Sequence, residues 1–227
     1  IKIKNKKIKF YSASEITFIR AALFGKKERE VYKFIDKYLK SDHIFFDIGA
    51  NIGVFSIYSS LIKNVKCIAF EPEYSNIFLL KKNIDLNNLS NLITTYPLAL
   101  GNSTSLSQLH LSSMESGSAL HTVSNESLKF TDENALVKSK IGSFSIKLDD
   151  FVKQTNIFPD MMKIDTDGAE LDILLGSKET LNKVSFIALE LPINEEKKQN
   201  CLRILDEFKF VEDRNLRVDR NLFFYKL

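Results

Sequence analysis

The residues that first suggest chemistry lie in the segment from Asp47 to Gly53, which reads Asp-Ile-Gly-Ala-Asn-Ile-Gly. The segment follows a run of apolar residues, as a turn does between a buried strand and a helix. Gly49 allows the backbone to turn and a ligand to approach closely, and Gly53 allows a helix to pack closely on a strand. The N–H groups at the start of the helix favour a polar or anionic ligand. Asp47 can accept hydrogen bonds from an ammonium group or from the amides of the turn. Alone, the segment could equally be a packing device.

A glutamate stands 22 residues after Gly49, directly after a second apolar run, in the sequence Phe70-Glu71-Pro72. Adjacent parallel strands bring their carboxyl ends together at the crevice where ligands bind. A carboxylate at this place suits the two hydroxyls of a ribose, and dinucleotide-binding folds carry an acid at about this spacing. Together, the turn and Glu71 predict a nucleoside ligand.

The residue at position 51 narrows the choice of nucleoside. In the dinucleotide fingerprint a glycine at this place makes room for a pyrophosphate, whereas this chain has Asn51. S-adenosyl-L-methionine carries no phosphate, so a larger residue is acceptable there. The pattern therefore favours adenosylmethionine over NAD. Two other classes stay open: an NAD-dependent oxidoreductase, and a catalytically idle module that keeps the cofactor fold.

A methyl acceptor must lose a proton when it is methylated, and three side chains are candidates for the base that takes it. Asp165 directly follows a third apolar run. It is therefore expected at the same sheet edge as Asp47 and Glu71. Asp165 is the first candidate base, Glu190 the second, and His121, in a polar segment, the third. The other two histidines are interpreted as structural.

The charged residues around Asp165 can also serve the structure alone. Lys163 lies inside an apolar run and needs a partner, so a structural ion pair is the preferred interpretation. Asp167 and Glu170 open the following helix, where the helix dipole favours carboxylates. With Asp165 and Glu190, these acids could also hold Mg²⁺ through oxygen ligands. We assign no metal ligands and keep Mg²⁺ as the alternative.

The elements that must position these residues alternate between apolar runs and helical patterns. This alternation predicts an α/β fold with a mostly parallel sheet and helices on both faces. The predicted strands are 44–48, 65–70, 92–96, 161–164, 184–189, 210–212 and 222–225, and the predicted helices are 54–62, 75–86, 169–175 and 197–208. The last two strands are joined by a loop alone, which predicts an antiparallel pair. A seven-stranded sheet with a reversed last strand is the shape of class I methyltransferases, a Rossmann-like fold.

The chain divides into two parts by its pattern. Residues 1–41 form a helical lead-in, with helical spacing over 14–40 and Gly25 between two helices. Residues 42–227 form the cofactor-binding domain. Within it, the Ser-rich interval of about 102–142 is expected to be a strand, a mobile substrate loop and a return strand, in which 106–111 and 143–148 alternate like strands.

Several stretches, in the expected order between about residues 42 and 191, resemble the FkbM-type methyltransferases. They are residues 46–53, 70–72, 99–101, 148–151 and 162–170. The most specific of them reads Lys-Ile-Asp-Thr-Asp-Gly-Ala-Glu. The resemblance implies O-methylation of a hydroxyl, typically on a sugar or a natural product. The expected acceptor is therefore a small molecule or a glycan.

The resemblance also implies roles for single residues. The turn would line the methionine part of the cofactor through Asp47, Gly49, Ala50, Asn51 and Gly53. Glu71, with Pro72 beside it, would hold the ribose, Ala99 and Leu100 would lie near adenine, and Asp165 would face the transferred methyl group. The chain departs from the family pattern at Asp167, where Glu is commoner, and at Pro192, where many members have a His.

Composition excludes some classes of protein. The net charge of +3 is small, no basic stripe is visible, and the Asn/Asp-Pro-Pro-aromatic motif of many nucleic-acid methyltransferases is absent after the fourth strand, so no nucleic-acid partner is expected. A nucleic-acid or protein acceptor stays the alternative within the methyltransferases. The two cysteines form no disulfide framework, and no apolar run approaches the ~18 residues of a membrane span. These features predict a cytoplasmic protein and leave its oligomeric state open.

Overall fold

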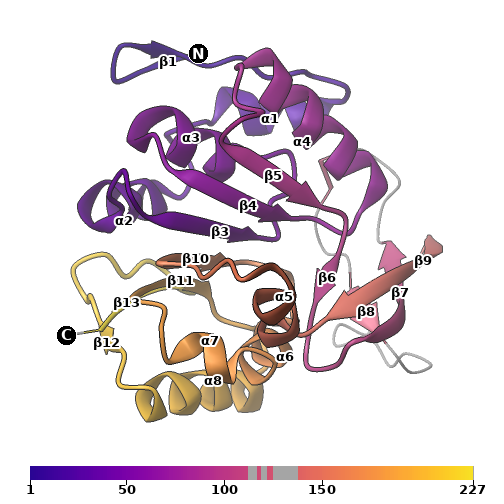
Figure 1. Cartoon of the computed structure of the whole chain (residues 1–227). Coiled ribbons are helices and arrows are strands. Elements are labelled where there is room, and N and C mark those ends of the chain that lie inside the picture. Colours follow the sequence, from indigo (N-terminus) through magenta and orange to yellow (C-terminus); the bar gives the residue numbers. More distant parts are fainter. Residues whose placement is uncertain (112–116, 119–121, 125–137, 227) are drawn as a thin grey trace.

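The computed structural model describes residues 1–111, 117–118, 122–124 (backbone only) and 138–226. Its centre is a seven-stranded sheet in the order β12-β13-β11-β10-β3-β4-β5 (Figure 1). The strands are β3 (Ile44–Ile48), β4 (Lys66–Phe70), β5 (Ile93–Tyr96), β10 (Met161–Ile164), β11 (Phe186–Glu190), β12 (Val211–Glu212) and β13 (Asn221–Tyr225). Strand β13 runs antiparallel to β11 and to β12, while β11, β10, β3, β4 and β5 are parallel. The predicted mostly parallel sheet with a reversed last strand is confirmed.

Helices cover both faces of this sheet, as expected. One face packs against α2 (Arg29–Tyr38), α3 (Val54–Lys63) and α4 (Tyr74–Leu86). The other packs against α5 (Leu148–Thr155), α6 (Glu170–Leu175), α7 (Lys178–Leu181) and α8 (Glu195–Glu207). Because successive side chains of a strand point to opposite faces, Phe45 enters the first core and Phe46 the second. Strands buried on both faces are therefore apolar almost throughout, which is why their positions could be predicted.

The polar interval after the third predicted strand forms a second sheet. Its four strands, in the order β6-β9-β7-β8, are β6 (Ala99–Leu100), β7 (Ser105–Leu111), β8 (Thr122–Ser124) and β9 (Ser139–Ile146). The predicted strand and return strand are confirmed as the antiparallel pair β7–β9. The predicted end of the return strand was wrong: it stops at Ile146, and Leu148 already begins helix α5. His121, the third candidate base, lies outside the described residues.

The N-terminal part forms a small hairpin, β1 (Lys2–Ile3) with β2 (Lys6–Lys7), and then two helices, α1 (Glu15–Ala22) and α2. Gly25, with a φ of 74°, lies between these helices as predicted. The lead-in shares the main core, since Phe24 and Tyr32 pack against Tyr58 of α3. Among the described residues, no helix combines the length and the apolar character that crossing a bilayer requires.

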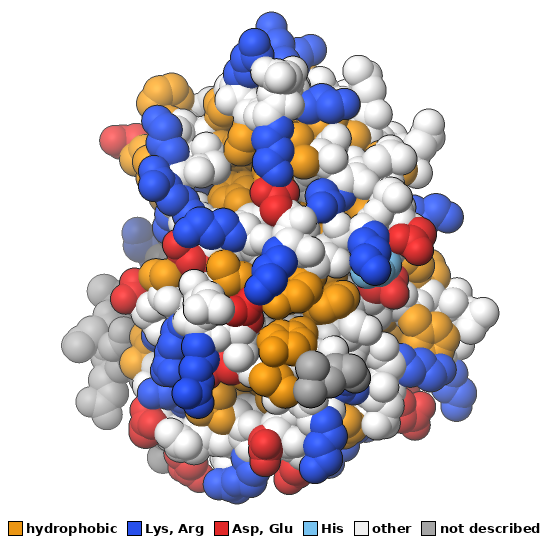
Figure 2. Space-filling view, turned by 90° about the vertical axis from the view of Figure 1, so that its left-hand side faces the viewer, with side chains coloured by type: hydrophobic (Ala, Val, Ile, Leu, Met, Phe, Trp, Pro, Cys, Tyr) orange, Lys and Arg blue, Asp and Glu red, His pale blue; other side chains and the backbone are white. Residues whose placement is uncertain are grey.

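The two ends of the parallel strands differ in character. Figure 2 views the molecule from the side where α2 and the C-terminus lie in Figure 1, and shows hydrophobic side chains gathered in the middle of a charged surface. At this amino end of β11, Tyr38 of α2 stacks on both Phe186 and Tyr225. The polar residues singled out from the sequence lie instead at the opposite, carboxyl ends of the strands.

Candidate active site

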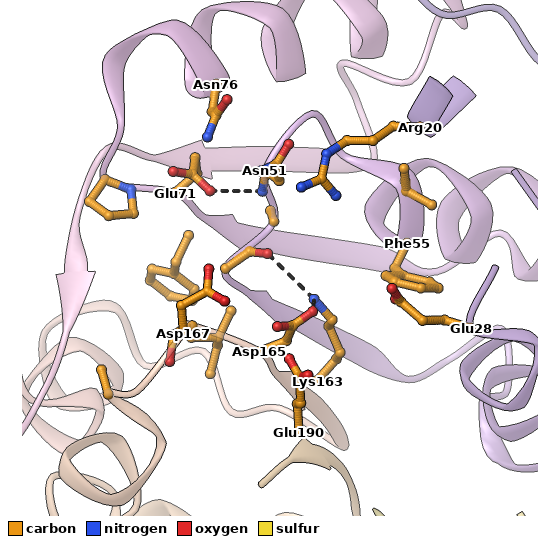
Figure 3. A pocket seen from close by; sticks show the side chains of 18 of the residues that line it. Arg20, Glu28, Asn51, Phe55, Glu71, Asn76, Lys163, Asp165, Asp167 and Glu190 are labelled. Carbon is orange, nitrogen blue, oxygen red and sulfur yellow. Dashed lines mark hydrogen bonds and ion pairs between the residues drawn. The ribbon is translucent and has the colours of Figure 1, made fainter. Parts of the chain in front are cut away.

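A cavity of about 250 Å³ opens at the carboxyl ends of β3, β4, β10 and β11. It is the place where open α/β sheets bind their ligands. Its wall includes most of the residues predicted to hold the cofactor, namely Gly49, Ala50, Asn51, Glu71, Pro72, Ala99, Leu100 and Asp165. Asp47 and Gly53, which carry the same prediction, are not among the lining residues. Glu190, the second candidate base, also lines the cavity (Figure 3).

The turn after β3 is shaped by the approach of two backbones. Gly49 has a φ of 76°, and a Cβ atom there would lie 1.9 Å from the carbonyl oxygen of Asp165. The sequence suggested close approach of a ligand at this glycine; the structure shows that the end of β10 is the crowding neighbour. A Cβ atom on Gly53 would lie 2.2 Å from a side-chain carbon of Leu80. Gly53 therefore permits the packing of α3 on α4, which corrects the expected packing of a helix on a strand.

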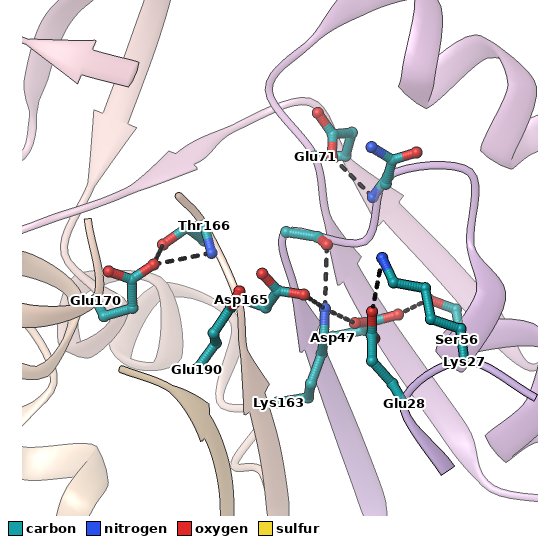
Figure 4. Close-up of polar contacts among 12 residues, drawn as sticks. Lys27, Glu28, Asp47, Ser56, Glu71, Lys163, Asp165, Thr166, Glu170 and Glu190 are labelled. Atoms are coloured by element: carbon teal, nitrogen blue, oxygen red, sulfur yellow. Dashed lines mark hydrogen bonds and ion pairs between the residues drawn. The ribbon is translucent and has the colours of Figure 1, made fainter. Parts of the chain in front are cut away.

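Behind this turn, a buried lysine joins two aspartates (Figure 4). Lys163 lies directly opposite Asp47 in the parallel register of β10 and β3. Its Nζ lies 3.0 Å from Oδ2 of Asp165 and 3.8 Å from Oδ1 of Asp47, and it donates to the carbonyl oxygen of Gly49 at 3.4 Å. Burial disfavours the ammonium charge, but attraction by Asp165 and Asp47 outweighs it and raises the pKa of Lys163. The expected ion pair of Lys163 is present.

Asp47 is fully buried and is held from two sides. Ser56 of α3 donates to its Oδ2 at 2.6 Å, and the Lys163 ammonium group faces its other oxygen. Burial raises the pKa of Asp47, and the attraction of Lys163 opposes that rise. The ammonium group that faces Asp47 thus belongs to Lys163, and Asp47 itself lies behind the cavity wall.

Two carboxyl groups meet at the edge of the cavity, where β10 and β11 end. The carboxyl of Asp165 lies within hydrogen-bonding reach of Glu190, and Arg220 pairs with Glu190 from the other side. Burial would raise the pKa of Asp165, but the attraction of Lys163 lowers it. Burial and the neighbouring Asp165 raise the pKa of Glu190 against the opposing charge of Arg220. One carboxyl is thus held ionised, while its neighbour holds a proton more readily.

Glu71 follows β4 and is tied to the turn. Its two carboxylate oxygens accept from the backbone N–H of Asn51 at 2.8 Å and of Glu73 at 3.0 Å. Burial raises its pKa to about 7. The side chain of Asn76 is a third hydrogen-bond partner. An ionised carboxylate offers about four lone-pair sites, so room remains for a further donor such as a ribose hydroxyl. Asn51 has a φ of 49°, a conformation that asparagine tolerates better than most residues, and its own side chain accepts from the N–H of Ile52.

Glu170 is directed away from Asp165, to the backbone at the start of the next helix. Oε1 of Glu170 accepts from the N–H groups of Thr166 and Gly168, at 3.1 and 3.0 Å, at the start of α6. This is the structural role considered for it in the sequence. Within the described ranges, no group of three or more His, Cys, Asp or Glu residues is arranged to hold a metal ion.

Some lining residues carry no sequence signal. Arg20 of α1, Asn76 of α4 and Ser118 line the cavity but come from distant parts of the chain and belong to no motif. Arg20 alone offered a hint, because it is the single basic residue of a helix that is otherwise mostly apolar, Glu15–Ala22.

Comparisons with known proteins agree with this geometry. A family model described as the methyltransferase FkbM domain matches residues 47–217. The chain is 27% identical over 187 residues to the hexuronic acid methyltransferase AglP of Haloferax volcanii, covering 80% of this chain and 69% of that protein. A ribosomal protein L11 methyltransferase of Syntrophomonas wolfei is 33% identical over 70 residues, which are 31% of this chain and 22% of that protein.

Solved structures share the fold at low sequence identity. Precorrin-6y C5,15-methyltransferase of Geobacter metallireducens superposes with a TM-score of 0.52 and 11% identity, over 96% of this chain and 95% of that one. A ribosomal protein L11 methylase of Lactobacillus delbrueckii gives a TM-score of 0.51 and 10% identity, over 88% and 78% of the two chains. These likenesses show the class I methyltransferase fold alone.

Proposed function

The chain belongs to the FkbM methyltransferase family, and from this we propose that it methylates a hydroxyl group of a saccharide with adenosylmethionine as donor. The similarity to a hexuronic acid methyltransferase supports a sugar acceptor. Family membership also favours a methyl donor over the nicotinamide of the alternative interpretation. The observation that carries the choice of a hydroxyl is the pair of carboxyl groups, Asp165 and Glu190, at the edge of the cavity.

The described residues fit the proposed cofactor. Glu71, when ionised, can accept from a ribose hydroxyl, and the apolar side chains of Ala99 and Leu100 offer a surface for adenine. The wall carries the acids Asp165 and Glu190 near the proposed methyl position, while Glu28, also on the wall, pairs with Lys27. Negative charge there favours the positive sulfonium of adenosylmethionine. When bound, the cofactor would supply an electrophilic methyl carbon.

Glu190 is the better base of the two carboxyl groups. A general base works best when its pKa lies near the operating pH. The pKa of Asp165 is lowered and that of Glu190 is raised, which reverses the order of candidates expected from the sequence. In the proposed step the acceptor oxygen bonds to the methyl carbon, the carbon–sulfur bond breaks towards sulfur, and Glu190 takes the hydroxyl proton. Asp165 stays ionised beside Lys163.

The same charges argue against a carboxylate acceptor. A uronic acid offers both hydroxyls and a carboxylate, but a carboxylate beside Asp165 and Glu190 would meet charges of its own sign. A hydroxyl carries no charge and donates to a carboxylate. The expected product is therefore a methyl ether rather than a methyl ester.

The test is transfer of a tritium-labelled methyl group to a panel of neutral glycosides, uronic acids, ribosomal protein and RNA. We expect label on saccharides that survives mild base, which hydrolyses esters and spares ethers. Because Glu190 must lose its proton to act, kcat should rise with pH as that group ionises. Label found mainly in base-labile ester, protein or RNA would contradict the saccharide ether.

The base is tested with two glutamate variants. Glu190→Gln should lower kcat by about 10²- to 10⁴-fold and abolish the rise of kcat with pH. Glu195→Gln, on an exposed helix start, is the matched control and should behave as the unaltered protein. A Glu190→Gln variant with an unchanged pH profile would remove Glu190 as the base.

A further inference from the structure

The dipeptide Gly117–Ser118 adjoins the cavity, which Ser118 lines, and is hydrogen-bonded to three separate elements. Nδ2 of Asn51, in the turn after β3, donates to the carbonyl oxygen of Ser118 at 2.9 Å. Asn76 of α4 both accepts from the N–H of Gly117 at 2.7 Å and donates to the Ser118 carbonyl at 3.3 Å. Arg20 of α1 donates through Nε to the Gly117 carbonyl at 2.7 Å. These bonds make the dipeptide a fixed wall of the cavity.

Arg20 presents the rest of its guanidinium group to this cavity. Its Nε is used by Gly117, while within the described part of the chain no carboxylate lies within ion-pair distance of it. Figure 3 shows the group beside Asn51, among the residues that line the cavity. Guanidinium nitrogens form a planar fork that matches the two oxygens of a carboxylate. With Nε anchored, the two Nη atoms are oriented before any ligand binds.

Ser118 adds a second free donor. The residue is 5% exposed and lines the cavity, and its hydroxyl has no hydrogen-bond partner among the residues that the structure describes. A buried hydroxyl without a partner is rare in proteins and points to a ligand atom that completes it. Arg20 and Ser118 are brought together by the same dipeptide, so one ligand group can meet both.

We propose that Arg20 and Ser118 bind the α-carboxylate of the amino-acid part of adenosylmethionine. The inference rests on the proposed cofactor, whose only anionic group is this carboxylate. Glu71 would fix the ribose at one side of Asn51, and Arg20 lies at the other side, towards α1 (Figure 3). Asp165 on the same wall suits the neighbouring positive charge of the cofactor. The N-terminal lead-in thus supplies a residue of the cofactor site.

Asn76 is a positioning residue in this arrangement. It is 1% exposed and holds both backbone groups of the dipeptide. Gly117 has a φ of 85°, and a Cβ atom there would lie 2.8 Å from a side-chain carbon of Thr17 in α1. The dipeptide thus links α4, through Asn76, to α1, through Arg20 and Thr17, beside the Arg20 guanidinium.

The experiment compares two ligands by calorimetry. S-adenosylhomocysteine carries the amino-acid part, and 5′-methylthioadenosine lacks it. Arg20→Ala should weaken binding of S-adenosylhomocysteine by about 10- to 150-fold, the range for hydrogen bonds to a charged group, and leave binding of methylthioadenosine unchanged. Arg20→Lys should retain part of the preference for S-adenosylhomocysteine over methylthioadenosine, since lysine keeps the positive charge but lacks the planar pair of donors. Ser118→Ala should weaken S-adenosylhomocysteine several-fold and selectively.

Arg29→Ala, an exposed arginine at the start of α2, is the matched control and should bind both ligands as the unaltered protein does. Failure of the unaltered protein to bind either ligand would overturn the proposed cofactor. Normal binding by that protein, with the ligand preference intact in Arg20→Ala, would overturn the role of Arg20 alone. Equal loss of both ligands in Arg20→Ala would also overturn it, because a structural role predicts that result.

Discussion

Lys163 offers the sharpest test of how the site is built, because its ammonium group lies between Asp47 and Asp165. Its side chain is 6% exposed and that of Asp47 is 0% exposed. Oδ1 of Asp47 has no hydrogen-bond partner within the described ranges, so the ammonium group at 3.8 Å is the charge that faces it. Lys163→Met keeps the length of the side chain and removes that charge. Asp47 then becomes a buried acid without a counter-charge.

The expected loss in the free energy of unfolding is about 3–5 kcal/mol, the range for removing one partner of a buried ion pair. Burial already raises the pKa of Asp47, and removal of Lys163 raises it further. A group whose folded-state pKa lies above its unfolded value contributes stability at low pH that is lost as the pH rises through the folded pKa. The deficit of Lys163→Met should therefore be larger at pH 8 than at pH 5.

Urea unfolding followed by far-ultraviolet circular dichroism measures this, since the chain contains no Trp. The double variant Asp47→Leu, Lys163→Met should recover most of the loss, because a buried pair replaced by apolar groups is often neutral. Lys33→Met, which breaks a surface pair with Glu30, should change stability by less than about 1 kcal/mol. A single variant within about 1 kcal/mol of the unaltered protein at pH 8, or a double variant no better than the single one, would refute the reasoning.

Two further predictions concern the walls of the cavity. Affinity for 5′-methylthioadenosine should rise with pH through about 7, because burial raises the pKa of Glu71 to about that value and its ionised form accepts from ribose. Calorimetry between pH 6 and 8.5 measures this rise, which should be absent in Glu71→Gln. Gly49→Ala should destabilise the protein by at least about 2 kcal/mol in urea unfolding, because Gly49 has a φ of 76° and its Cβ would meet the Asp165 backbone. Gly142→Ala, with open space around it, should be close to neutral.

The central sheet could be predicted because its strands are buried on both faces. Residues 44–48 and 161–164 are apolar except where Asp47 and Lys163 pair across the register. Short apolar runs of this kind, set between helical patterns, are typical of the buried strands of a parallel sheet. The reversed strand β13 was predictable because only a loop joins it to β12.

Helix α5 could not be predicted, because its start overlaps a strand pattern. The alternation of β9 continues to Ile146, and Leu148 extends that alternation by one further step. The helix is decided by tertiary contacts: Asp149 accepts from the backbone N–H groups of Glu179 and Thr180 of α7 at 2.9 and 2.8 Å. Contacts between residues at least 30 positions apart in the chain leave no pattern in the local sequence.

The residues of the site also fall into those that the sequence could predict and those that it could not. Glu71 and Asp165 were predictable since each directly follows an apolar run, and the carboxyl ends of parallel strands meet. Arg20 was not, since it reaches the cavity through a bond to Gly117, 97 residues away. The role of Asp47 was also beyond the sequence, because its partner depends on the register of β3 with β10.

The proposed order of the two candidate bases depends on Lys163, for which a structural ion pair was the preferred interpretation of the sequence. Lys163 attracts Asp165 and lowers its pKa, while burial and Asp165 raise that of Glu190. Paired acids with divergent pKa values divide the acid and base roles between them. Lys163→Met should therefore change more than stability: Asp165 loses its counter-charge and competes with Glu190 for the proton. The pH at which kcat rises should then shift in the enzyme that stays folded. An unshifted profile would show that Lys163 does not influence the proton of the carboxyl pair.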